Sequence, residues 1–220
     1  KNMILDQTIE RFIDSKLLLE NEIERKNHKK SGKLSASKLG WPLQHQILDH
    51  LGVEPAPFDG YTLRKFLRGK TVENWLVSQM PGVLETQKFV EYKGCIGFAD
   101  VLVDSDKYEH KVGIIPHEIK SVTNAKFKRL NGAPDDQHAL QGAMYALGLG
   151  KEWFAIDYVA ADDLRVRTYV LEVKDYQSRI DNIIADYEKQ LELKTVPVFE
   201  PLYSWQANKL YNSYYEWSAL

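Results

Sequence analysis

The sequence has almost no cysteine: Cys95 is the only one in 220 residues. A single thiol excludes an internal disulfide, a four-cysteine zinc site and a four-cysteine iron–sulfur cluster. The chain also lacks any apolar run of about 18 residues, the length that a membrane-spanning helix needs, and its first residues carry no apolar signal-peptide core. These absences predict a soluble, cytoplasmic protein with no membrane contact.

An excess of either charge is lacking as well. The 29 Lys and Arg residues nearly balance 31 Asp and Glu residues, which gives a formal net charge of −2. Proteins that coat nucleic acid through bulk charge are basic, so this class is disfavoured, whereas a local basic groove stays open. The apolar share of 44% and the charged share of 27% are those of a globular protein, and we expect a folded core.

The hydrophobic periodicity predicts helices, three strands, a helix, two strands and a last helix. An N-terminal helical extension and a basic, Lys-rich linker are expected over residues 1–33, before one domain over residues 34–220. The resulting fold class is α/β, with a mixed central β-sheet flanked by helices. The expected strands are 83–92, 94–103, 112–122, 153–160 and 166–173, and the main helices of the domain are 62–80, 134–148 and 175–193.

Two acidic residues and a lysine stand out on neighbouring predicted strands. Asp100 lies on one strand, and Glu118 and Lys120 lie on the next with their side chains on the same face. If these strands pair, Asp100 comes to lie beside Glu118. Two converging carboxylates repel each other, and a hard divalent cation relieves that repulsion. Such a cation activates water against a phosphoryl group, and Lys120 can stabilise the charge that develops.

The Glu-x-Lys pattern alone is weak, because it recurs at Glu24, Glu91, Glu109, Glu172 and Glu192, where solvated charge pairs explain it. The Glu118 copy differs in its context, since it lies in an apolar strand pattern directly after a strand that carries an aspartate. This context favours a functional interpretation of Glu118 and Lys120.

Two helical pairs add to this pattern. Gly69 and Glu73 lie one turn apart, so that the glycine would permit a close backbone approach and Glu73 would supply a third carboxylate. Gln141 and Tyr145 share a face of the helix 134–148, with small residues between them. Each pair also has a structural explanation, as a surface glutamate beside a tolerated glycine or as a buried tyrosine.

In this order, the residues resemble the PD-(D/E)XK nuclease superfamily, specifically its RecB-like exonuclease branch. The resemblance covers about residues 34–145 and includes Ser35 and Leu39 as the start of the first nuclease helix. It implies a restriction-endonuclease-like core, DNA as the partner and Mg²⁺ or Mn²⁺ as the cofactor. It further implies four metal ligands, namely the carboxylates of Glu73, Asp100 and Glu118 and the backbone carbonyl of Ile119.

One departure from this branch concerns cysteine. Many relatives hold an iron–sulfur cluster through a cysteine after the first helix and three more near the C-terminus. Here Trp41 and Pro42 stand where Cys-Pro is expected, and residues 205–217 contain aromatic side chains and no cysteine. We therefore expect no iron–sulfur cluster. The aromatic tail could close the core or dock a partner, and closing the core is favoured. Because no helicase domain is attached, we expect a stand-alone enzyme of the phage or bacterial type.

Basic residues flank the expected cleft in two groups, and we expect them to contact phosphates without reading sequence. Arg68 and Lys128 are the substrate-binding candidates from these groups, beside Gln141 and Tyr145. Phe127 could stack on an unpaired base or pack on the protein. The two groups are Arg64, Lys65, Arg68 and Lys70, and Lys126, Lys128 and Arg129 in a predicted loop.

The sequence thus predicts a metal-dependent DNA exonuclease of phage or bacterial DNA recombination, repair or processing. Asp100, Glu118, Lys120 and Glu73 are the catalytic candidates. Three alternatives stay open: a structure-selective or flap endonuclease of the same fold, a non-catalytic DNA-binding or protein-interaction module, and an α/β protein of another function. No pattern indicates a protein partner.

Overall fold

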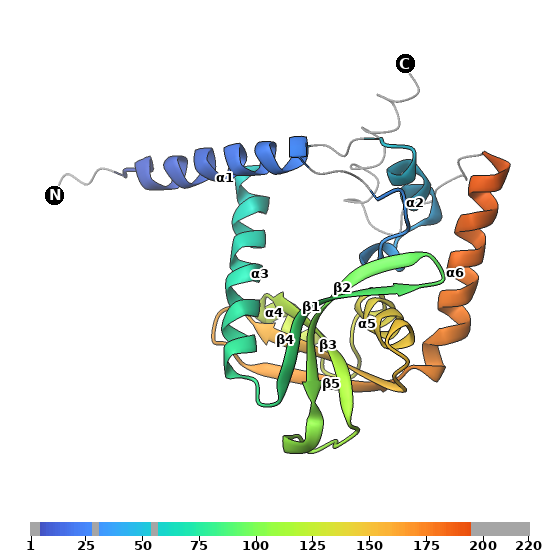
Figure 1. Ribbon diagram of the computed structural model, residues 1–220. Helices are drawn as coiled ribbons and strands as arrows, with labels where there is room; N and C mark the ends of the chain where they lie inside the picture. Colours follow the sequence, from blue (N-terminus) through green and yellow to red (C-terminus); the bar gives the residue numbers. More distant parts are fainter. Residues whose placement is uncertain (1–4, 28–30, 54–56, 195–220) are drawn as a thin grey trace.

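A mixed β-sheet forms the centre of the computed structural model, which describes residues 5–27, 31–53 and 57–194 (Figure 1). The sheet follows the chain order from β1 to β5, and only β3 and β4 run parallel. A parallel pair needs a crossover connection, which α4 and α5 supply here. The predicted fold class is confirmed. The strands are β1 (Val83–Tyr92), β2 (Cys95–Asp104), β3 (Ile114–Val122), β4 (Trp153–Ala160) and β5 (Val166–Glu172).

The helices begin at positions that the side chains specify. Asp59 accepts a hydrogen bond from the Thr62 N–H at the start of α3, and Thr123 accepts one from the Lys126 N–H at the start of α4. The helices are α1 (Thr8–Asn27), α2 (Leu43–His50), α3 (Gly60–Gln79), α4 (Asn124–Arg129), α5 (Asp136–Gly148) and α6 (Lys174–Leu193), with short 3₁₀ turns at Ala36–Lys38 and Ser105–Lys107.

Helices α3 and α5 cover opposite faces of the sheet. Val72 and Leu76 of α3 pack against one face of the sheet, which includes Val101, Ile119 and Val159. Leu140 and Met144 of α5 belong to a larger cluster that includes the even-numbered side chains of β4 and helix α6. Because side chains alternate along a strand, Glu118 and Lys120 lie on the α5 face, opposite to Ile119.

Helix α1 lies across one end of α3 and has no buried residue (Figure 1). Arg64 of α3 forms ion pairs with Glu10, at 3.0 Å, and with Asp14. The apolar pattern of α3 predicts six inward side chains. Leu63, Val72 and Leu76 are buried as predicted, whereas the other three lie off this buried stripe and are exposed. These are Phe66 (53% exposed), Leu67 (52%) and Trp75 (37%).

Residues 126–129 were predicted to lie in a loop, but they form the last part of α4. The cap by Thr123 and the burial of Phe127 stabilise this short helix. The segment is too short to show an apolar period of about 3.6 residues, so no helix was predicted here. The boundary predicted between residues 33 and 34 stays a prediction, and the aromatic tail lies outside the described residues. None of the helices within those ranges is long and apolar enough to cross a bilayer.

Two helical glycines offer a matched test of the packing. A Cβ on Gly142 would lie 2.6 Å from the buried ring of Phe154, whereas a Cβ on Gly69 would meet nothing within 4 Å. Both substitutions by alanine favour the helix, by about 0.5–1 kcal/mol. We expect Gly69→Ala to stabilise the protein by that amount and Gly142→Ala to destabilise it by about 1–3 kcal/mol, because the core is already filled. Urea unfolding measures both, and equal stabilisation by the two variants would contradict this packing.

Candidate active site

Asp100 marks the point where β2 and β3 stop pairing. The ladder between these strands runs from Asp104 and Ile114 to Val101 and His117, and it ends there. Beyond this point, the Oδ2 atom of Asp100 accepts a hydrogen bond of 2.8 Å from the Ile119 N–H. The side chain thus replaces a backbone acceptor, and it places Asp100 beside Glu118 as the sequence predicted.

Glu118 is buried on the α5 face of the sheet and forms an ion pair with Lys120, two residues along β3. Only 2% of the residue is exposed. The Oε2 atom of Glu118 is also buried, and it has no hydrogen-bond partner among the described residues. A buried acceptor without a partner is costly, so this oxygen has capacity for a ligand.

Glu73 reaches this place from α3. Its carboxylate accepts hydrogen bonds from Lys70, at 2.9 Å, and from the Gln87 amide of β1, at 3.0 Å. The same Gln87 nitrogen donates to Oδ1 of Asp100 at 3.4 Å. One amide therefore joins Glu73 to Asp100, and the predicted third carboxylate lies close to the other two. Open space lies beside Gly69, so the close backbone approach there stays a prediction.

Charge is concentrated in this small volume. Burial raises the pKa of Glu118 to about 8, against the lowering effect of Lys120, and the neighbouring Asp100 and Glu73 raise it further. Burial also raises the pKa of Asp100, although the Ile119 N–H and Lys120 oppose this. Burial lowers the pKa of Lys120, but Glu118, Asp100 and Glu73 outweigh this effect and raise it overall, so Lys120 is an ammonium ion.

The donor set fits a hard divalent cation. Mg²⁺ and Mn²⁺ prefer carboxylate and carbonyl oxygens, which are the donors that Glu73, Asp100 and Glu118 provide. In the described part of the chain, however, no three such groups already stand in metal-binding geometry. Gln87 and Lys120 instead occupy oxygens of the three carboxylates. The Oε2 atom of Glu118 has no partner among the described residues, and the backbone carbonyl of Ile119 is the further donor that the resemblance implies.

Gln141 and Tyr145 are joined to each other on the face of α5 that covers the sheet. The Gln141 amide donates to the Tyr145 hydroxyl at 3.0 Å, and both residues are buried. The tyrosine ring lies so close to Gly97 of β2 that a Cβ there would be 2.8 Å from the ring. Burial raises the pKa of Tyr145, and the charge of Glu118 adds to this, so the phenol stays protonated. The two side chains are thus adjacent to the acidic group.

The predicted basic rim is present only in part. Lys128 is exposed, and the Nε atom of Arg68 is buried with no partner in the described ranges. Two of the other candidates already have acidic partners. Arg64 forms an ion pair with Glu10 of α1, and Lys126 forms one with Asp135. Of the two roles predicted for Phe127, packing on the protein is the one that the structure shows. The residue is 4% exposed, and the Arg167 guanidinium lies 4.4 Å from its ring centre.

Two polar residues at the site had no role in the sequence analysis. Gln87 gave no signal, because a glutamine in a strand has no motif of its own. His138 lies one helical turn before Gln141, and its Nδ1 atom is 2.8 Å from the Tyr158 hydroxyl. Burial and the nearby charge of Lys120 lower the pKa of His138 to about 3, so it is a neutral imidazole beside the ammonium group.

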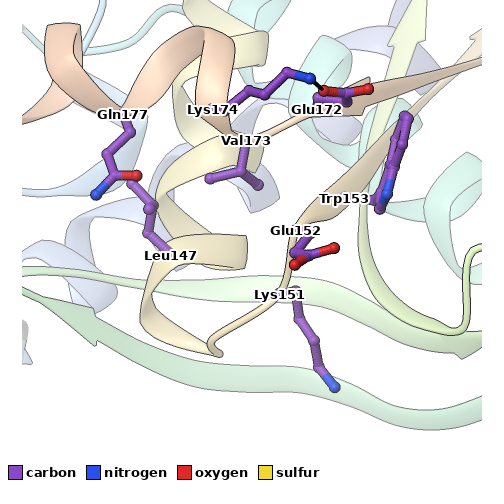
Figure 2. A pocket seen from close by; sticks show the side chains of 8 residues that line it. All are labelled: Leu147, Lys151, Glu152, Trp153, Glu172, Val173, Lys174 and Gln177. Carbon is purple, nitrogen blue, oxygen red and sulfur yellow. Dashed lines mark ion pairs between the residues drawn. The ribbon is translucent and has the colours of Figure 1, made fainter.

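A groove of about 460 Å³ lies elsewhere, where the ends of α5 and β5 meet the starts of β4 and α6 (Figure 2). Lys174 and Glu172 form an ion pair across part of it. No predicted site residue lines this groove. Its lining residues are Leu147, Lys151, Glu152, Trp153, Glu172, Val173, Lys174 and Gln177.

Comparison with known proteins finds similar folds among solved structures, but no match by sequence. No protein-family model matches the chain, and no curated protein matches its sequence. Among solved structures, LHK-Exo in complex with dAMP is similar over 74% of this chain and 91% of its own, with a TM-score of 0.53 and 16% identity. The alkaline exonuclease LHK-Exo from Laribacter hongkongensis is similar over the same shares, with a TM-score of 0.50 and 14% identity. At such identities the likeness shows the fold alone, a mixed β-sheet flanked by helices.

The raised pKa of Glu118 predicts how the stability of the metal-free protein depends on pH. The folded protein keeps the Glu118 proton up to about pH 8, whereas the unfolded chain loses it near its ordinary value of 4.5. The contribution of Glu118 to the free energy of unfolding is therefore complete below pH 4.5 and is lost as the pH rises through 8. In EDTA, we expect Glu118→Gln to gain stability over the wild type as the pH rises from about 5 to about 9. Thermal melting measures this, with exposed Glu109→Gln as the control; a difference that does not change with pH would contradict the prediction.

Proposed function

We propose that this chain is a Mg²⁺- or Mn²⁺-dependent deoxyribonuclease, and more specifically a DNA exonuclease of the RecB-like branch. The observation that carries the proposal is the convergence of Glu73, Asp100 and Glu118 around one lysine, at the place where β2 and β3 separate. A surface charge network would not bury its central carboxylate with an oxygen left free, as Glu118 Oε2 is.

The three carboxylates and the Ile119 carbonyl are the proposed metal ligands. A divalent cation supplies polarisation of the phosphoryl oxygen and a lower pKa for bound water. Asp100 is already held for this role, because its Oδ2 atom is fixed by the Ile119 N–H and its Oδ1 atom faces Gln87. Glu118 is held by Lys120 through one oxygen, which leaves the other free.

Lys120 acts as a cation in this proposal and not as a base. The surrounding carboxylates raise its pKa, so a proton stays on Nζ at neutral pH. An ammonium group in that position stabilises negative charge that develops on the phosphate during attack by water. The neutral His138 nearby does not compete with this charge, because burial and Lys120 lower its pKa.

Gln141 and Tyr145 are the proposed residues that position the scissile phosphate. Both can donate hydrogen bonds, since the amide carries two N–H groups and the phenol stays protonated. Arg68 and Lys128 are the proposed phosphate contacts outside the centre. Arg68 suits this role because its buried Nε atom has no partner within the described ranges.

The choice of DNA and of exonuclease activity rests on the neighbours' names and on the resemblance of the motifs. One neighbour is called an alkaline exonuclease, and one was solved with dAMP, a nucleotide of DNA. A function in recombination or repair, in a phage or bacterial cell, belongs to the same proposal. The alternative, a structure-selective endonuclease, would use the same site residues. It differs from an exonuclease in the DNA substrates that it cleaves.

The proposal is tested with linear DNA labelled at the 5′ or the 3′ end, in Mg²⁺, Mn²⁺ or EDTA. We expect metal-dependent loss of nucleotides from an end, and a fall of at least about a hundredfold in Asp100→Asn and Lys120→Met, because each removes a charge needed at the reacting phosphate. Lys107→Met, on the short turn after β2, is the matched control and should cleave normally. Undiminished cleavage by Lys120→Met would contradict the assignment.

Circular single-stranded DNA separates the remaining alternatives in the same assay. An exonuclease leaves the circle intact, whereas an endonuclease cuts it. DNA binding without cleavage of any substrate would instead identify a non-catalytic module.

A further inference from the structure

Gln87 has an unusual backbone conformation for a residue in the middle of a strand. Its φ angle is +50°, in the left-handed region that side chains other than glycine seldom adopt. Such conformations persist only where the surroundings hold them, and they concentrate at functional sites. The conformation therefore calls for a reason in the contacts of Gln87.

The strand register places Gln87 opposite Asp100. Thr86 pairs with Val101 and Lys88 pairs with Ala99, while Gln87 between them makes no pair in the ladder. Its side chain instead reaches both Glu73 and Asp100 through a single nitrogen. The local distortion of β1 thus directs an amide between two carboxylates that come from different elements.

A side-chain amide has two ends with opposite properties, and half a turn about the last side-chain bond exchanges them. Its nitrogen donates hydrogen bonds to carboxylates, as it does here, and its oxygen is a neutral ligand of hard cations. An N–H group that points at a bound cation is repelled, whereas the carbonyl oxygen is attracted. The same residue can therefore serve the site with and without the ion.

From this geometry we infer that Gln87 is a further positioning residue and oxygen donor of the divalent-cation site. Without the ion its N–H group holds Glu73 and Asp100 together against their repulsion, and with the ion its carbonyl oxygen faces the cation, directly or through a water. This inference rests on the proposed function, because it concerns the same carboxylates.

The test is Mn²⁺ binding to the full-length, DNA-free protein, measured by electron paramagnetic resonance and calorimetry. The wild type and Asp100→Asn define the site, since only binding that Asp100→Asn weakens belongs to it. Gln87→Leu keeps the size of the side chain and removes both polar atoms. Gln87→Gly also removes them and accepts the positive φ, so it keeps the test valid if the leucine variant does not fold.

We expect Gln87→Leu and Gln87→Gly to weaken Mn²⁺ binding by about tenfold, as is common when a group that supports a metal site is lost. Gln87→Glu should tighten it by a similar factor, because the variant supplies a charged oxygen in the same place. Thr86→Glu adds the same charge one residue away, on the other side of the strand, and should change the affinity much less.

Binding by Gln87→Leu that equals or exceeds that of the wild type, while Asp100→Asn is weakened, would overturn the inference and leave the proposed function intact. A tightening by Thr86→Glu as large as that by Gln87→Glu would also overturn it, because a general charge effect would then explain both. Equal binding by the wild type and Asp100→Asn would refute the cation site itself, and the role of Gln87 with it.

Discussion

The burial of Glu118 is the constraint on which the rest of the site depends. A carboxylate removed from water needs a cation or hydrogen-bond donors, and Lys120 on the same strand face supplies a positive charge to one of its oxygens. Sheet pairing ends beside it, so the Ile119 N–H that would continue the ladder is taken by the Asp100 side chain. Where β2 and β3 separate, the fold thus brings acidic groups close together.

Like charges that lie so close together must be balanced, and α3, β1 and β3 each contribute a side chain to this balance. Glu73 accepts hydrogen bonds from Lys70 and from the Gln87 amide, and the same amide also donates to Asp100. Lys120 donates to Glu118 and supplies the opposite charge. These contacts hold three carboxylates in one place without an ion. Because the balance is made by exchangeable donors, the same oxygens are available to a divalent cation, as the metal chemistry that we propose requires.

Much of the architecture was predictable because its signals are local. The strands from β1 to β5 show short, apolar, β-branched patterns between turns, and the helices show their own period, so the α/β class was confirmed. The alternation of side chains put Glu118 and Lys120 on one face. Two other predictions were wrong for different reasons. Phe66 and Trp75 are apolar but exposed, which only tertiary packing decides, whereas α4 depends on a local cap by Thr123 in a segment too short to show a helical period.

By itself, the sequence determined the order of the elements and the types of chemical group, because periodicity and side-chain chemistry are encoded residue by residue. Only the tertiary structure decided which groups meet. Glu73 and Asp100 are joined by Gln87, a residue that belongs to no motif and reaches them through a left-handed backbone angle. The open space beside Gly69 and the burial of Phe127 were likewise decided by the packing of the surrounding elements. Such contacts arise between segments far apart in the chain, and no local pattern records them.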